Sequence, residues 1–324
     1  MSESAALQAQ RGLPWYVALL HGLGGLLAGV LLTGFLAFTL LENLDPPAFG
    51  VAGAVLIGTG TAIAGLRSYP FVRLFALSLS LSGHAALGFY LLEEFEFDGL
   101  VAALVVLSAG LYLVYRDALH RFLSVLVTLA VVSAWVLSGE TVAPNAIHGV
   151  LLIVAAAGVW CFSGALSEAV RPIGYAAVVT LLVLPLLVLV PREHADIDWW
   201  AARAVAVVSG LFVLGLIRRA YPGFPGAMLS GSALAVAAIG AVTTPGLAFA
   251  IAVLVLGFWR GERILTLLGL LFLPLFLIVF YYALEITLLD KSLMLMAGGA
   301  LFLSLRQGLI LWERRQIAVG GGGG

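Results

Sequence analysis

The chain has 324 residues, of which 62% are hydrophobic and only 10% are charged, and its mean hydropathy is +1.13. Soluble globular domains do not have this balance, so the composition excludes a soluble protein and predicts an all-α chain with many membrane-spanning helices. The formal net charge is −1, and the single cysteine, Cys161, excludes an intrachain disulfide bond. We expect the chain to be embedded in the lipid bilayer and not to bind nucleic acid.

Apolar blocks follow one another along the chain and are separated by short polar connectors. One crossing of a bilayer takes about 20 residues, so the blocks predict a polytopic helical protein with about 12 transmembrane helices. The blocks cover residues 14–41, 49–66, 70–92, 98–115, 119–138, 145–167, 172–190, 199–217, 225–242, 245–259, 264–284 and 288–311. Several of them, among them the fourth, ninth and tenth, are close to the lower limit for a span.

The connectors are too short to fold by themselves, which predicts a single transmembrane domain over residues 14–311. Residues 1–13 then form a cytoplasmic N-terminal tail. Residues 312–324 form a cytoplasmic C-terminal tail, and we interpret the glycines at 320–324 as an added linker.

The charged residues alternate between the connectors in a way that predicts the orientation. If the N-terminus is cytoplasmic, 13 of the 16 basic residues fall on the cytoplasmic side. They are Arg11, Arg67, Arg73, Arg116, Arg121, Arg171, Arg218, Arg219, Arg260, Arg263, Arg306, Arg314 and Arg315. Most acids, including those between Glu93 and Asp98, fall on the other side. This is the positive-inside signature, so we predict that both termini lie in the cytoplasm.

The first two blocks are rich in glycine. Gly25 and Gly29 form a G-x-x-x-G motif, in which the missing side chains let two helix backbones approach closely. We predict that this motif packs the first span against another helix.

His84, in the third block, is the strongest polar candidate within a predicted span. It lies near mid-membrane, and Ser80, four residues earlier, shares its helix face. An imidazole buried in lipid must face protein or water, which makes it a functional candidate. The alternative is a structural histidine hydrogen-bonded to a neighbouring helix. We predict this second role, with a neutral His84, because ionising a desolvated imidazole is costly. His84→Gln should then leave assembly largely intact.

Two prolines interrupt predicted spans. Pro185 lies in the seventh block and Pro274 in the eleventh, and each removes a backbone hydrogen bond from its helix. Transporters use such broken helices as hinges and binding sites, whereas many other membrane helices simply bend there. Both residues are therefore candidate helix kinks.

The chain must reverse near its C-terminal end, because the apolar sequence from Ile264 to Leu311 is too long for one crossing. Thr287 and Asp290 match the S/T-x-x-D/E capping pattern, which predicts a new helix starting at Thr287. Tyr281 and Tyr282 then fall in the aromatic belt at the membrane surface.

Lys291, in the first turn of that last helix, is the only lysine of the chain. A cation at this position opposes the helix dipole. It either marks the membrane surface or has a dedicated partner, such as Glu285 or an anionic group. We predict the second, because an ordinary surface anchor would more often be one of the fifteen arginines.

The motifs of common catalytic sites are missing from the sequence. It has no H-E-x-x-H, no G-x-S-x-G, no cysteine pair and no His and acid cluster with metal-ligand spacing. We expect no enzymatic activity, no cofactor and no bound metal.

The segment from Phe280 to Ser292, followed by Gly298 and Arg306, resembles the Y-Y-x-L-x-x-T-L-L-x-K-S ending of bacterial inner-membrane proteins called domain of unknown function 4401. The start of the first span, Pro-Trp-Tyr-Val at 14–17, and the start of the fifth, His-Arg-Phe-Leu-Ser at 120–124, are also similar to that family. The resemblance implies a Glu at the position of Asp290 in many relatives. The resemblance implies a bacterial inner-membrane location and a membrane-anchored partner with a G-D-Y-x-x-L-x-Y motif. It implies no activity and no catalytic residue.

Two functions fit these observations. The first is a non-enzymatic membrane subunit of a two-protein assembly that presents an acidic outer face to its partner. The second is a transporter or flippase for a small or amphipathic solute, which would use the prolines and His84. A water-accessible cavity that reaches His84 would favour transport, and a packed core would favour the subunit.

Overall fold

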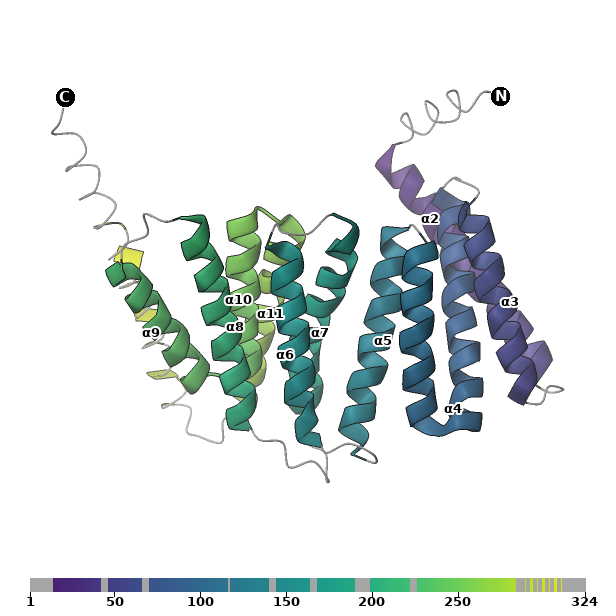
Figure 1. Cartoon of the computed structure of the whole chain (residues 1–324). Helices are drawn as coiled ribbons and strands as arrows, with labels where there is room; N and C mark the ends of the chain where they lie inside the picture. The colour runs from purple at the N-terminus through teal and green to yellow at the C-terminus, as the bar shows by residue number, and fades with distance from the viewer. Residues whose placement is uncertain are drawn as a thin grey trace. The chain divides into compact units, whose positions relative to one another are not determined.

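The computed structural model of the chain describes residues 14–41, 46–65, 70–115, 117–139, 144–163, 168–189, 199–221 and 226–283, and isolated positions between 289 and 310. The described residues are helical and include no strand, which confirms the predicted all-α class. Figure 1 labels the α-helices.

The helices agree closely with the predicted apolar blocks. They are α2 (Trp15–Leu41), α3 (Pro46–Gly65), α4 (Pro70–Val114), α5 (Ala118–Ser138), α6 (Ile147–Phe162), α7 (Arg171–Leu189), α8 (Trp199–Ala220), α9 (Gly226–Val242), α10 (Pro245–Arg260) and α11 (Arg263–Ala283). Two short 3₁₀ helices, η1 (Pro144–Ala146) and η2 (Glu168–Val170), precede α6 and α7. The last predicted block, 288–311, falls largely outside the described residues.

The contacts of the chain divide it into two compact units, residues 1–270 and 271–324. The boundary falls inside α11. All the helix contacts described below belong to the first unit, and the prediction of one domain over residues 14–311 stays a prediction.

Five described helices are long and apolar enough to cross a membrane by length and composition. They correspond to α3, α4, α5, α7 with η2, and α8. The segments within α2, α6, α9, α10 and α11 are apolar but shorter. Many large apolar side chains on these helices are exposed, such as Leu31 at 71%, Val106 at 72% and Phe258 at 82%. Such a surface fits a membrane-embedded protein.

α4 consists of two helical halves that meet at Glu96. This residue has φ 57° and ψ −169°, and it is the only described residue other than glycine with a positive φ. The ends of the halves show that they run antiparallel, because Arg73 near the start of α4 pairs with Asp117 just after its end. At 45 residues, an unbroken α4 would be about 68 Å long, far more than one bilayer core. The hairpin is visible in Figure 1 and confirms the separate blocks at 70–92 and 98–115.

Glycines let α2 and α3 approach the first half of α4. A Cβ added to Gly25 would lie 2.0 Å from the carbonyl oxygen of Phe71, and one added to Gly60 would lie 2.7 Å from that of Ala76. Both neighbours are backbone atoms, which cannot rotate away. The predicted packing role of the G-x-x-x-G motif is therefore confirmed for Gly25. At Gly29 the nearest atom is the Ser78 hydroxyl, at 1.6 Å.

An aspartate fixes where α5 begins, and glycines fix where α5 and α10 end. The Asp117 carboxylate caps α5 by accepting from the backbone N–H groups of Leu119 and His120, and α5 ends at Gly139 in the left-handed conformation. Gly261, with φ 68°, ends α10 in the same way.

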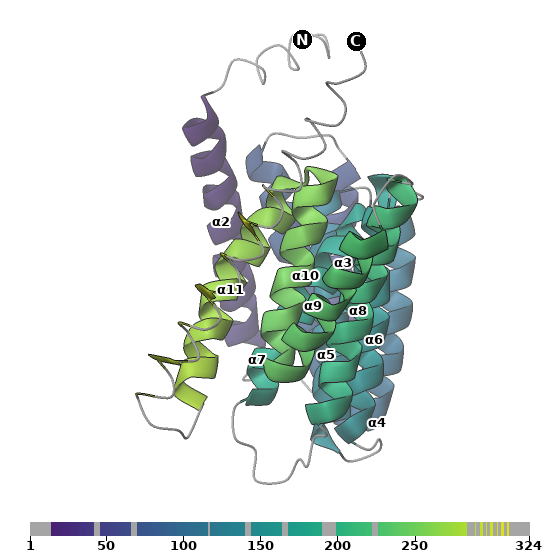
Figure 2. The ribbon, with the colours of Figure 1, turned by 90° about the vertical axis from the view of Figure 1, so that its left-hand side faces the viewer.

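Besides α2, α3 and α4, a second group of helices that contact one another comprises α6, α7, α8 and α10. α8 packs against α10, and the two lie side by side in Figures 1 and 2. Pro185 lies inside α7 and Pro274 inside α11, and both helices continue through their proline. A hinge at either proline stays a prediction.

Candidate functional site

The most polar buried site lies where the first half of α4 meets the start of α5. We call Ser80, His84, Tyr115 and His120 the histidine cluster. His120 is fully buried in the first turn of α5, and its Nε2 shares a hydrogen bond of 2.8 Å with the Ser80 hydroxyl. Such a bond between two helices is one of the forces that hold spans together in lipid.

His84 belongs to the same cluster but bonds differently from the prediction. Its Nδ1–H donates to the backbone carbonyl of Ser80 at 2.6 Å, one turn back on its own helix, and not to a neighbouring helix. Side chains of a helix lean toward its N-terminus, which explains this contact. The expected bond to a neighbouring helix is made by His120 and not by His84, whereas the structural, neutral role of His84 stays a prediction. The rings of His84 and His120 have centroids 6.0 Å apart.

Tyr115, between α4 and α5, covers the other side of His120. The two rings stack with centroids 3.7 Å apart and planes 9° from parallel. Tyr115 is only 3% exposed. A phenol is protonated at physiological pH, so the Tyr115 hydroxyl can donate a hydrogen bond.

Arg73 and Asp117 form an ion pair near the termini of the helices that carry the cluster. The guanidinium of Arg73 donates to Asp117, whose other carboxylate oxygen caps α5. Ser80 lies seven residues beyond Arg73, or about 10 Å along the helix. Asp117 thus joins the start of α4 to the start of α5. Because His120 lies three residues after Asp117, this contact positions His120 along α4.

Hydroxyl groups provide a further contact between α5 and the second half of α4. The Ser108 hydroxyl lies 3.1 Å from that of Ser124 and 2.5 Å from that of Thr128. Thr128 also donates to the carbonyl of Ser124. These groups satisfy one another, which is how polar side chains in spans act as interhelical links.

A second charged contact ties α7 to the turn between α10 and α11. Arg171 at the start of α7 lies 3.3 Å from a carboxylate oxygen of Glu262, and the Tyr175 hydroxyl donates to the other oxygen at 3.2 Å. Tyr112 of α4 donates to the carbonyl of Ala169 in η2. The helix ends with Arg73, Arg171 and Glu262 therefore lie on one side of the first unit.

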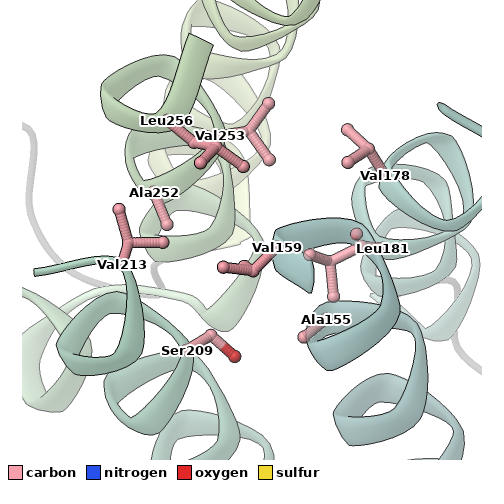
Figure 3. A pocket seen from close by; sticks show the side chains of 10 residues that line it. Ala155, Val159, Val178, Leu181, Ser209, Val213, Ala252, Val253 and Leu256 are labelled. Carbon is pink, nitrogen blue, oxygen red and sulfur yellow. The ribbon is translucent and has the colours of Figure 1, made fainter. Parts of the chain in front are cut away.

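A small void lies between α6, α7, α8 and α10, away from the histidine cluster (Figure 3). It has a volume of about 10 Å³, and aliphatic side chains such as Val159, Leu181 and Val253 line it. Ser209 contributes the one hydroxyl, which already donates to the carbonyl of Val205. This space is at the lower limit for one water molecule and has almost no polar partner for it.

The described residues contain no group of three or more His, Cys, Asp or Glu side chains that could hold a metal ion. The expectations of no cofactor and no enzymatic activity stay predictions.

Of the predicted site residues, only Ser80 and His84 are brought together in the first unit. Tyr281 and Tyr282 lie at the end of α11, in the second unit, with ring centroids 5.6 Å apart, and Tyr282 is 78% exposed. The other four predicted residues lie outside the described residues, so the capped reversal and the lysine pocket stay predictions. They are Glu285, Thr287, Asp290 and Lys291.

Two residues of the histidine cluster, Tyr115 and His120, were not among the predicted site residues, and neither was the charged pair of Arg73 and Asp117. A signal was present for Asp117, because Asp before an apolar block is typical of a helix N-cap. His120 follows three residues later and so falls in the first helical turn. Its pairing with Ser80, 40 residues away, depends on which spans are neighbours.

These features define a class: a helical, membrane-embedded protein whose buried polar groups link its helices. The family model described as Domain of unknown function (DUF4401) matches residues 14–311, nearly the whole chain, and the chain belongs to this family. Searches of the curated proteins and of the solved structures gave no match.

Proposed function

We propose that this protein is a non-enzymatic integral subunit of a bacterial inner-membrane assembly, with about 12 spans and both termini in the cytoplasm. Its proposed partner is a membrane-anchored protein with a G-D-Y-x-x-L-x-Y motif, the kind of partner that the family resemblance implies. The observation that carries the proposal is how the buried polar groups of the first unit are used: Ser80 bonds to His120, and Ser108 to Ser124, across helix contacts.

The packing of α6, α7, α8 and α10 supports the same role. A passage for a solute needs a space of its own size lined with some polar groups. The void between these helices is about 10 Å³ and apolar, and it does not include His84. Such packing suits a rigid scaffold.

The distribution of charge supports the proposed orientation. Arg73 and Arg171 lie at the helix ends joined by Asp117 and Glu262, whereas the α4 hairpin turn at the opposite ends of these helices carries Glu93, Glu94, Glu96 and Asp98. Asp98 accepts from the indole of Trp135 at 2.6 Å, which holds this turn against the end of α5. In the proposed orientation the acidic turn faces outward and is available to a partner.

Transport of a small or amphipathic solute is the second candidate. One observation favours it: His84 Nε2 and His120 Nδ1 are buried and have no hydrogen-bond partner among the described residues. Ionisable groups within spans are often parts of ion or solute pathways.

Co-expression distinguishes the two functions. The tagged chain is purified in mild detergent after co-expression with a membrane protein that carries the G-D-Y-x-x-L-x-Y motif. We expect the two to co-elute in a fixed ratio, and we expect Glu93→Gln with Glu94→Gln to weaken this more than Arg218→Gln with Arg219→Gln. Recovery of the chain alone, together with a solute flux in proteoliposomes that His84→Gln abolishes, would replace the subunit with the transporter.

A further inference from the structure

The histidine cluster holds three buried polar atoms that no described protein group satisfies. They are His84 Nε2, His120 Nδ1 and the Tyr115 hydroxyl. The three side chains are 6%, 0% and 3% exposed. An unsatisfied buried polar group costs about 1–3 kcal/mol, so three in one place call for a common ligand.

The hydrogen bonds already made fix what each free atom can do. A carbonyl oxygen only accepts, so His84 Nδ1 must carry the proton that it donates to Ser80. In the neutral ring, His84 Nε2 is then a bare acceptor. The Tyr115 hydroxyl is a donor, and His120 Nδ1 donates or accepts depending on the direction of the Ser80–His120 bond.

The spacing of the rings selects the size of the ligand. The centroids of His84 and His120 are 6.0 Å apart, and the parallel stacking keeps the Tyr115 ring 3.7 Å from that of His120. A direct N–H···N bond or a tetrahedral metal ion would hold the two imidazole centres about 5 Å apart. A water molecule about 2.8 Å from one nitrogen of each ring holds the centres about 6–6.5 Å apart when its two hydrogen bonds meet at about 100–110°.

We propose that His84, His120 and Tyr115 form a binding site for one buried water molecule between α4 and α5. The water donates to His84 Nε2 and accepts from the Tyr115 hydroxyl. Its remaining donor and acceptor match His120 Nδ1 in either tautomer, so one molecule has enough hydrogen-bonding groups for all three free atoms. Ser80 holds both imidazoles in place, through its carbonyl to one and its hydroxyl to the other.

The site lies between the two helices that the Arg73–Asp117 pair also joins. The inference does not depend on the proposed function, since a subunit and a transporter can each contain such a site.

Removing the Tyr115 hydroxyl tests the site, because the proposal predicts that Tm falls and an unsatisfied hydroxyl predicts that it does not. If water accepts from Tyr115, Tyr115→Phe loses a hydrogen bond and should lower Tm by about 2–4 °C in the purified full chain. Tyr112→Phe is the matched positive control, because that hydroxyl donates to a known partner, the carbonyl of Ala169. Thr180→Val is the negative control, because its hydroxyl is buried in α7 with no described partner. A Tyr115→Phe variant as stable as the wild type, or more stable, would overturn the proposal.

A measurement on the unmodified chain decides the question even if Tyr115→Phe does not fold. The protein is labelled with ¹⁵N-histidine in nanodiscs, and magnetisation is transferred from water to the imidazoles. Resonances are assigned with His84→Gln and His120→Gln. We expect transfer to both rings and His84 in the Nδ1–H form. Absence of transfer would show a dry cluster, and histidine resonances that change on adding EDTA would show a metal ion; either result overturns the water site.

Discussion

Gly25→Ala tests the packing of α2 against α4 at a single atom. The added Cβ would lie 2.0 Å from the carbonyl oxygen of Phe71, whereas an ordinary contact begins at 3.4 Å. The backbones must therefore separate by about 1.4 Å, because no side-chain rotation relieves the clash. Overpacking of this kind costs about 1–3 kcal/mol.

Gly34→Ala is the matched control in the same helix, since a Cβ there would meet nothing within 4 Å. Both substitutions gain about 1 kcal/mol of helix propensity, so this gain cancels when the variants are compared. We expect Gly25→Ala to be less stable than Gly34→Ala by about 1–3 kcal/mol. Unfolding by SDS in mixed micelles measures the difference. Equal stability of the two variants would refute the close contact between α2 and α4.

Three further substitutions test the site and the C-terminal reversal. Ser80→Ala leaves His120 Nε2 buried and unpaired, so it should lower the unfolding free energy by about 1–3 kcal/mol in the same titration; no change would disprove the interhelical bond. Asp117→Ala removes the α5 cap and should cost about 0.5–2 kcal/mol, whereas Asp117→Asn should cost less because it loses only the pairing with Arg73; equal losses would contradict the capping role. Lys291→Arg should lower both Tm and recovery of the partner, because a wider guanidinium fits a lysine pocket badly. Wild-type behaviour of that variant would make the lysine an ordinary surface charge.

The helices could be predicted from the sequence because short sequence patterns, such as a run of acids or a glycine pair, each favour one local structure. The acids between Glu93 and Asp98 interrupt an apolar run, and the structure reverses α4 at Glu96 within that interval. Gly25 predicted a close helix contact, and a backbone carbonyl lies at that place.

The partners of the helices could not be predicted in this way. The spacing of Ser80 and His84 indicated a shared face, but nothing local shows that His120 lies against that face. The bond between Ser80 and His120 joins residues 40 positions apart and depends on the order of the spans in space. The same holds for Arg171 and Glu262, which are distant in sequence and pair at the ends of α7 and α10.

Cysteine accessibility in intact cells tests whether the protein crosses the membrane several times with its acidic turn outside. Cys161→Ser removes the only native thiol. In that background, Glu94→Cys marks the exposed turn of α4, and Arg260→Cys marks the exposed end of α10 near Glu262. A membrane-impermeant maleimide should label position 94 in intact cells and position 260 only after permeabilisation. Labelling of position 260 in intact cells, with position 94 protected until permeabilisation, would contradict the account.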